Sequence, residues 1–147
     1  MSSKVNLPEF LKANGLSLTT QRQVILDEVE SSGKHLTADQ IFQRVRKTMP
    51  KISFGTVYRN LGVLVELELL SKHYFRGETA YYEKFKPLHH HILCNECGQV
   101  EDLKGVKIAE LEPEIEQLTS YKVDSHQLLV TGLCPKCRTK EVEIKLE

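Results

Sequence analysis

The four cysteines of the chain stand in two CxxC pairs, Cys94–Cys97 and Cys134–Cys137. Each pair can present two sulfurs to one ion, so two pairs brought together form a tetrahedral thiolate site with Zn–S distances near ~2.3 Å. The 36 residues between the pairs exceed the ~15–20 of a compact zinc ribbon. The spacing therefore predicts a structural Zn(II) site, made by Cys94, Cys97, Cys134 and Cys137, that joins the ends of a larger domain.

The same cysteines have two alternative interpretations. Disulfides need an oxidising compartment, but residues 1–14 show neither an apolar core of secretory length nor a cleavage pattern. A redox dithiol of the thioredoxin type uses one CxxC at a βαβ unit, not two pairs far apart. Zinc is therefore the preferred interpretation, ahead of the redox pair and the disulfides.

A histidine cluster precedes the first CxxC pair. His89 and His91 are two residues apart on a predicted strand, 89–93, so both imidazoles project from one face and His90 projects from the other. Two nitrogens on one face form half of a metal site. The alternative is that these are polar groups satisfied by their neighbours, as the isolated His35 and His126 would usually be.

Length and composition limit the choice of protein class. A chain of 147 residues that is 40% hydrophobic suits one domain of ordinary size or two small ones. No apolar run approaches the ~20 residues of a membrane span, so we expect a soluble, cytoplasmic protein with no membrane partner. Because the formal net charge is zero, a nucleic acid would have to be bound by a local patch.

The first half of the chain predicts short helices followed by a hairpin. Residues 7–14 form a brief apolar-faced segment, and Thr20–Gln23 and Thr37–Gln40 are capping-box patterns that open two further helices. Ser53 can cap a fourth helix. The period then changes to that of strands over 69–85, with a glycine turn. This order is typical of a winged helix-turn-helix, and we assign residues 1–84 to it.

The fourth helix is the candidate for DNA recognition. Val57, Leu61 and Leu64 mark its buried face, and the opposite side is polar, aromatic and cationic, as major-groove recognition requires. Asn60 lies closer to the buried side than Arg59 does. An ordinary solvated helix face is the alternative. The candidate DNA-binding residues are Ser53, Thr56, Tyr58, Arg59 and Asn60.

The second half has a different pattern. Strands are predicted at 89–93 and 99–103, a helix at 106–118 and a strand at 121–133, which places both CxxC pairs at strand ends. Residues 84–87 mark a hinge. The predicted fold class is α+β: an N-terminal winged helix-turn-helix, followed at 85–147 by a small α/β dimerisation domain with the structural four-cysteine zinc site.

Five motifs stand in the order found in a known family. With TTQRQVIL, HLTADQIF, TVYRNL, the three histidines before CNECG, and CPKC, the chain resembles the ferric uptake regulator family over roughly residues 7–140. The resemblance implies a bacterial, homodimeric, metal-dependent transcriptional repressor rather than an enzyme. Its winged helix would bind double-stranded operator DNA, and its α/β half would dimerise around the zinc.

The resemblance also implies a regulatory metal site for Fe(II) or Mn(II). Its nitrogen and oxygen ligands suit these ions better than a thiolate site would. One ion held by both halves would favour the arrangement that fits DNA, and DNA would in turn tighten metal binding. The implied ligands are His35, Glu83, His89, His91 and Asp102.

Whether the repressor responds to peroxide or to a metal is a separate question. In the family, aspartate at position 102 is typical of peroxide sensing, whereas glutamate at position 83 is typical of iron sensing. We favour peroxide, with His35 or His89 as the imidazole that is oxidised when the bound iron reduces peroxide. An iron-responsive or zinc-responsive uptake repressor is the alternative within the family. A zinc-stapled metalloenzyme that uses the histidine cluster is the alternative of another class, and it would need an open coordination position, a general base and a cavity.

The family has a third metal site, to which His90, Glu110 and His126 correspond here. Leu88 occupies a position where the family has a histidine. Leucine cannot coordinate a metal, so we predict at most a weak third site.

Overall fold

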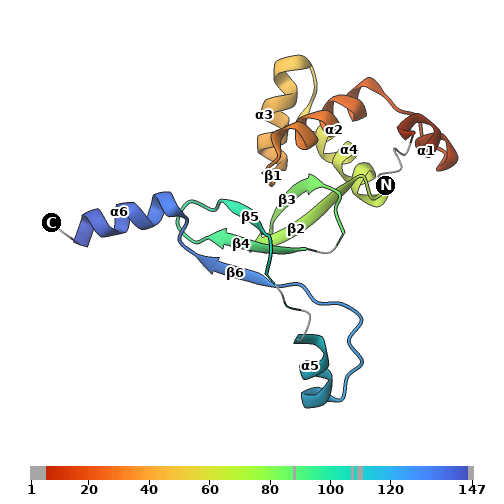
Figure 1. Cartoon of the computed structure of the whole chain (residues 1–147). Helices are drawn as coiled ribbons and strands as arrows, with labels where there is room; N and C mark the ends of the chain where they lie inside the picture. Colours follow the sequence, from red (N-terminus) through yellow and green to blue (C-terminus); the bar gives the residue numbers. More distant parts are fainter. Residues whose placement is uncertain (1–5, 88, 107, 109–110, 146–147) are drawn as a thin grey trace. The chain divides into compact units, whose positions relative to one another are not determined.

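The computed structural model describes residues 6–87, 89–106, 108 and 111–145. The chain divides into two compact units, residues 1–85 and 86–147. The predicted division between residues 84 and 85 lies one residue before this boundary. Figure 1 labels the elements of both units, which are described in turn.

Four helices form most of the N-terminal unit. They are α1 (Leu7–Ala13), α2 (Thr20–Ser32), α3 (Ala38–Thr48) and α4 (Phe54–Glu66).

The caps of these helices follow the sequence signals closely. Thr37 and Gln40 form the predicted capping box at α3, and the Ser53 side chain accepts a hydrogen bond from the Thr56 backbone amide at the start of α4. At α2 the prediction was wrong by one residue. Thr19, not Thr20, is the N-cap, because its hydroxyl accepts from the Arg22 amide at 3.2 Å. Adjacent threonines offer the same cap chemistry, so the sequence alone does not separate them.

A three-stranded antiparallel sheet completes this unit in the order β1-β3-β2. Strands β2 (Leu70–Arg76) and β3 (Thr79–Lys84) form the predicted hairpin, and Gly77 supplies the positive φ of the turn. Strand β1 (Leu36–Thr37) pairs with β3 at Tyr81 and Tyr82. It was not predicted, because two residues are too few to show a strand period.

One hydrophobic core joins α2, α3 and α4 to the sheet. On β3, Tyr82 is 2% exposed and packs into this core. The buried members of the core are Ile25, Leu26, Val29, Leu36, Ile41, Val45, Ile52, Val57, Leu61, Leu64, Leu70 and Tyr82. The helices therefore share their apolar faces with one side of the hairpin, and this packing fixes where both faces of the hairpin point.

The C-terminal unit contains a second three-stranded sheet, in the order β5-β4-β6. Strand β4 (His90–Cys94) is antiparallel to β5 (Val100–Leu103) and parallel to β6 (Leu129–Gly132). Two helices accompany it, α5 (Leu111–Thr119) and α6 (Pro135–Lys145).

Three predictions for this unit need correction. The helix predicted at 106–118 begins only at Leu111, because Gly105 turns with a φ of 75° and the segment that follows is not helical at residues 106 and 108. The strand predicted at 121–133 is limited to Leu129–Gly132, where β4 supplies its hydrogen-bonding partner. Helix α6 was not predicted. Pro135, which suits the first turn of a helix, begins it inside the second CxxC pair.

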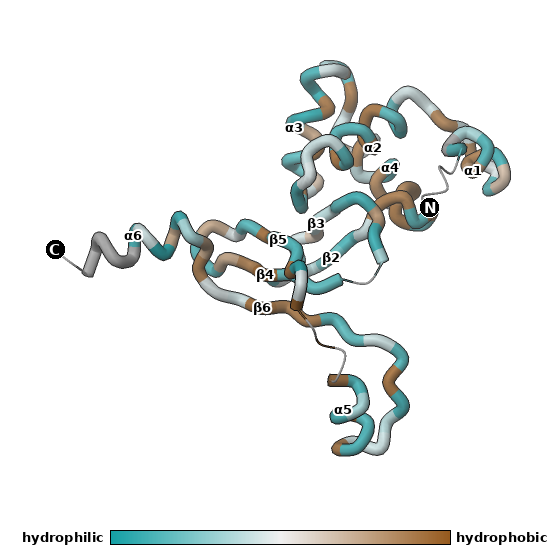
Figure 2. The backbone as a smooth tube through the Cα atoms, viewed as in Figure 1, coloured by the Kyte–Doolittle hydropathy of each residue, from teal (hydrophilic) through white to brown (hydrophobic). Residues whose placement is uncertain are grey.

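Little of the C-terminal unit is buried. Among residues 86, 87, 89–106, 108 and 111–140, only His91, Leu93, Cys94, Val100 and Cys137 are buried, and no residue of α5 is. Figure 2 shows hydrophobic colour along β4 and β6. Within the part of the chain that the structure describes, no helix is long and apolar enough to cross a bilayer.

Candidate metal centres and nucleic-acid surface

All four cysteines come together in the C-terminal unit. Their sulfur atoms lie within 4.8 Å of one another, and Cys97 Sγ is 3.8 Å from Cys134 Sγ. A tetrahedron with Zn–S bonds of ~2.3 Å has sulfur–sulfur edges of ~3.8 Å. All four cysteines are outside disulfides. The cluster therefore has the size and the ligands of a tetrathiolate Zn(II) site.

The backbone builds this cluster from the ends of two parallel strands. Cys94 ends β4 and pairs in register with Gly132 of β6, which brings the segment before α6 to the first CxxC pair. The Cys134 amide donates a hydrogen bond to Cys94 Sγ at 3.3 Å. On the other side of Cys94, the Gly98 amide donates to the Cys94 carbonyl at 3.0 Å and closes the turn.

Two of the thiols have shifted acidity. Backbone hydrogen bonds from Cys134 and Cys97 lower the pKa of Cys94 to about 6, so its thiolate is favoured near neutral pH. The pKa of Cys137 is raised to about 12, first by its hydrogen bond with the Cys134 sulfur and then by burial. The cluster therefore cannot ionise fully by itself, and a divalent cation would be needed to hold four thiolates together.

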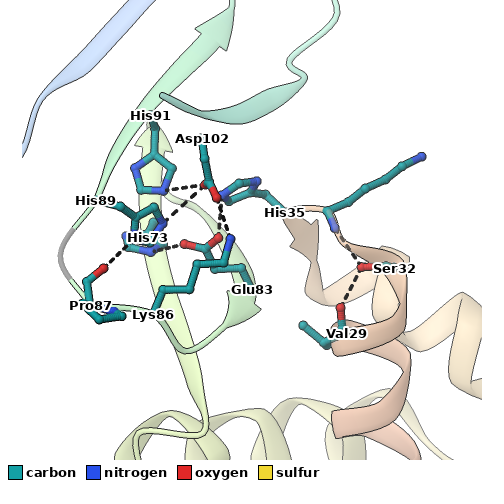
Figure 3. Close-up of polar contacts among 11 residues, drawn as sticks. Val29, Ser32, His35, His73, Glu83, Lys86, Pro87, His89, His91 and Asp102 are labelled. Atoms are coloured by element: carbon teal, nitrogen blue, oxygen red, sulfur yellow. Dashed lines mark hydrogen bonds and ion pairs between the residues drawn. The ribbon is translucent and has the colours of Figure 1, made fainter. Parts of the chain in front are cut away.

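In the N-terminal unit, two predicted ligands meet on the hairpin face away from Tyr82. His35, just before β1, places Nε2 at 2.8 Å from Glu83 Oε2 (Figure 3). Their side chains are only 6% and 3% exposed. His73, which was not predicted, places Nε2 at 2.9 Å from the other oxygen, Glu83 Oε1. Strand alternation was the signal available for His73, because it lies diagonally across from Glu83 on β2.

In the C-terminal unit, three predicted ligands gather at β4, at the residue just before it and on β5. The rings of His89 and His91 are 4.4 Å apart between centroids, and His91 pairs in register with Asp102. Asp102 Oδ1 lies 3.4 Å from His89 Nε2 and 3.8 Å from His91 Nε2. Lys86 Nζ contacts the other oxygen, Asp102 Oδ2, and the Pro87 carbonyl lies 2.9 Å from His89 Nδ1 (Figure 3).

These distances suit donors around an ion. Donors that are ~2.1 Å from one transition-metal ion at ~90–120° to each other lie ~3–4 Å apart, which covers the separations from Asp102 Oδ1 to the two imidazoles. If the Pro87 carbonyl accepts from His89 Nδ1–H, His89 Nε2 is left as the ligand atom, as is common for metal-binding histidines. The nitrogen and oxygen donors of each unit therefore fit Fe(II) or Mn(II).

The exposed face of α4 carries most of the residues predicted to bind DNA. Ser53, Tyr58 and Arg59 are exposed and Thr56 is half-buried. The Ser53 and Thr56 hydroxyls are 2.8 Å apart at the N-cap. The side chain of Tyr58 is accessible, with 52% of the residue surface exposed.

Asn60 differs from the other predicted DNA contacts. It is 8% exposed, accepts a hydrogen bond from Arg22 Nε at 3.1 Å, and donates to the Thr56 carbonyl at 2.9 Å. Arg22 also donates to the Ser17 carbonyl. Asn60 therefore connects α4 to α2 and to the segment before it, which is a packing role inside the unit.

Aromatic and basic residues near α4 extend this surface beyond the prediction. Phe54 stacks on Tyr58 with ring centroids 6.2 Å apart, and both are exposed. On β2, Lys72 Nζ lies over the Tyr74 ring at 5.3 Å, and its hydrogen bond with Tyr74 raises the pKa of Lys72. Lys72 therefore remains a cation at neutral pH. The signal available was strand alternation, which places Lys72 and Tyr74 on one face.

The residues of the predicted third site are only partly described. His90 stacks on His126 with ring centroids 5.0 Å apart, and His126 Nδ1 lies 2.6 Å from Glu112 Oε1. Glu110 lies outside the described residues. The Leu128 amide donates to His90 Nδ1 at 3.1 Å. Glu112, not predicted, is thus the carboxylate that contacts His126.

Comparison with known proteins identifies the family of this chain. The sequence model of the ferric uptake regulator family matches residues 13–131. The chain belongs to the ferric uptake regulator family. It is 31% identical over 130 residues to a protein named peroxide-responsive repressor PerR from Staphylococcus saprophyticus subsp. saprophyticus. The aligned region covers 88% of each chain.

Solved structures of this family show the same fold. The ferric uptake regulator Fur of Helicobacter pylori, described as having three functional metal-binding sites, is 27% identical with a TM-score of 0.78, and the match covers 90% of this chain and 89% of that one. PerR from Streptococcus pyogenes, described in terms of peroxide sensing and gene regulation, is 30% identical with a TM-score of 0.51 over 90% of each chain.

Proposed function

We propose that this chain is a metal-dependent, DNA-binding transcriptional repressor that holds a structural Zn(II) and responds to a regulatory Fe(II) or Mn(II). The observation that carries the proposal is that each unit contains a partial set of nitrogen and oxygen ligands. The N-terminal unit offers His35 and Glu83 and the C-terminal unit offers His89, His91 and Asp102. Neither set alone matches the five ligands that the family resemblance implies.

One ion bound by both sets would link the two units. Metal binding would then favour one arrangement of the winged helix relative to the C-terminal unit, since a ligand stabilises the state in which it makes more contacts. By linkage, operator DNA that selects the same arrangement raises metal affinity by the same factor. In this way the two ligand sets would couple metal occupancy to DNA affinity.

DNA binding is assigned to the N-terminal unit, with α4 in the major groove. Support comes from the exposed Ser53, Tyr58 and Arg59 and the half-buried Thr56. The change Arg59→Ala should weaken operator binding, and if the arginine contacts a phosphate the salt slope should fall by ~1. Lys104→Ala, at an exposed position of the C-terminal unit, is the matched control. Equal salt slopes for both variants and the wild type would argue against a phosphate contact.

Dimerisation is assigned to the C-terminal unit. Support comes from its exposed apolar residues, since Leu118 is 77% exposed and Tyr121 is 76% exposed. A second copy of the chain would cover such a surface, and it would also place two winged helices for two half-sites on DNA.

For the signal, we propose peroxide, sensed through bound iron in the cytoplasm. Support comes from Asp102 and from the similarity to proteins named peroxide-responsive repressors. Bound iron would be the site of peroxide reduction: His35 or His89 would gain one oxygen atom of the peroxide, and the other oxygen would leave as water. Mass spectrometry of iron-loaded protein after peroxide treatment tests this. If both histidines remain unmodified, the iron-responsive alternative replaces the peroxide proposal.

A gel-shift titration with a fragment of the chain's own promoter, with and without Mn(II), tests the main proposal. We expect binding only when Mn(II) is present. The Asp102→Ala variant should no longer bind the DNA fragment when Mn(II) is added, while its zinc content stays unchanged. Glu101→Ala changes the neighbouring exposed carboxylate and should behave as wild type. Binding that ignores Mn(II), or no binding at all, would refute the metal switch and reopen the metalloenzyme alternative.

A further inference from the structure

Glu83 is held at both of its oxygens by different histidines. His73 Nε2 lies 2.9 Å from Oε1, and His35 Nε2 lies 2.8 Å from Oε2. Because His35 is a predicted ligand and His73 is not, one oxygen is directed toward the ligand set and the other is engaged outside it. The Glu83 side chain is 3% exposed, so solvent cannot easily replace the His73 contact.

Aromatic packing fixes the position of His73. Its ring stacks on Phe75 with centroids 5.3 Å apart and an interplanar angle of 23°. Phe75 also contacts the edge of His35 at 5.8 Å and the ring of Tyr81 at 5.4 Å. These residues lie on the hairpin face opposite the core residue Tyr82. His73 is therefore held by its own strand and does not depend on a metal for its orientation.

Asp102 shows the same division in the C-terminal unit. Lys86 Nζ contacts Oδ2, whereas Oδ1 faces the Nε2 atoms of His89 and His91 at 3.4 and 3.8 Å. A charge-assisted hydrogen bond between an ammonium and a carboxylate is stronger than a neutral one. The Lys86 side chain is 43% exposed and that of Asp102 is 14% exposed, so Lys86 covers the outer oxygen from the solvent side.

We propose that His73 and Lys86 are positioning residues that keep Glu83 and Asp102 monodentate toward the regulatory ion. This inference rests on the proposed function, in which one ion takes ligands from both units. A carboxylate that offers one oxygen supplies one donor to an ion, whereas a carboxylate that offers both oxygens supplies two. If either carboxylate turned to offer both oxygens, the number of donors around the ion would rise by one. Outer-shell partners of this kind orient ligands and tune the metal.

Co(II) is the probe for the test, because the intensity of its d–d absorption falls when five-coordinate ions become six-coordinate. The protein is first loaded with Zn(II) at the cysteines, which absorbs no visible light, and is then titrated with Co(II). Lys86→Met and His73→Phe each remove a positioning contact and keep a side chain of similar bulk. We expect the d–d bands of each variant to fall several-fold from the wild-type intensity.

Conservative variants separate positioning from general structural damage. Lys86→Arg keeps a cationic donor, and His73→Gln keeps an N–H near the position of Nε2, so both should restore the wild-type spectrum. Lys84→Met, at an exposed lysine two residues from Lys86, should leave it unchanged. Because Lys86 is partly exposed, Lys86→Met should fold even if His73→Phe does not.

The outcomes are distinct. Wild-type spectra for Lys86→Met and His73→Phe with Co(II) bound would overturn the inference and leave the proposed function intact. If the Co(II) spectrum of the His91→Ala variant is the same as that of the wild type, the proposed regulatory site is refuted, and the inference with it.

Discussion

The N-terminal unit buries twelve residues in one hydrophobic core, whereas the C-terminal unit buries five among residues 86, 87, 89–106, 108 and 111–140, of which two are zinc-site cysteines and one is His91. The first unit therefore has the side chains to fold by itself. In the second, a zinc ion bound by the four cysteines would replace much of a core, since the binding energy of a structural metal is also folding energy. The unit proposed to bind DNA is self-contained, and the unit proposed to dimerise is not.

The exposed residues of the two units support the same contrast. In the N-terminal unit the most exposed large apolar residues, Tyr58 and Tyr74, are tyrosines that also carry a hydroxyl. In the C-terminal unit Leu118 and Tyr121 are more than three-quarters exposed, and α5 buries no residue. A helix with an apolar face and no buried residue needs a further partner surface.

The largest predicted effect is removal of the zinc. Cys97→Ser should abolish stoichiometric zinc binding and unfold most of the C-terminal unit, because structural zinc contributes about 10 kcal/mol or more. The N-terminal unit should keep its fold. Metal analysis and amide NMR spectra test this. Dispersed resonances from residues 89–106 and 111–140 in the zinc-free variant would show that this unit has a sufficient core after all.

The corresponding change in the N-terminal unit is a cavity in its hydrophobic core. Leu61 on α4 is fully buried, so Leu61→Ala should lower the free energy of unfolding of this unit by about 2–5 kcal/mol. Zinc content should remain at wild-type level. Chemical denaturation followed by circular dichroism measures the loss. A cost under 1 kcal/mol, or a simultaneous loss of zinc, would contradict the independence of the two units.

A smaller effect is expected at the exposed face of α5. Leu118→Ala should change the unfolding free energy of the N-terminal unit by less than about 0.5 kcal/mol. It should weaken self-association by about 1–2 kcal/mol, or roughly tenfold in Kd, if this face is a dimer contact. Analytical ultracentrifugation gives the Kd. Lys122→Ala, an exposed polar position nearby, is the control, and equal Kd values would place the dimer contact elsewhere.

The smallest effect concerns a single cap in the N-terminal unit. Thr37→Ala removes the hydroxyl that accepts from the Gln40 amide at 3.3 Å and should cost about 1 kcal/mol of unfolding free energy. Thr37→Ser keeps the hydroxyl and should recover most of this stability. Thermal denaturation distinguishes the two variants, and indistinguishable midpoints would mean that tertiary packing alone sets the start of α3.

Local signals predicted the N-terminal unit well and the C-terminal unit less well. Caps at Thr37 and Ser53 and the turn at Gly77 depend on neighbours in sequence, so they could be identified before the fold was known. The bounds of β6 depend on its distant partner β4, and the start of α5 depends on a turn at Gly105. Apolar patterning carries little information where the apolar face is left uncovered.

By itself, the sequence determined the ligand chemistry: four thiols in two pairs, and histidines and carboxylates of a kind that binds Fe(II) or Mn(II). It also determined the order of the helices and strands other than β1 and α6, because caps and periodicity act over a few residues. Only the tertiary structure decided that His73 and Lys86 hold the outer oxygens of Glu83 and Asp102, and that Asn60 is used for packing. Those contacts join residues at least 10 positions apart, and strand register and helix packing set such distances.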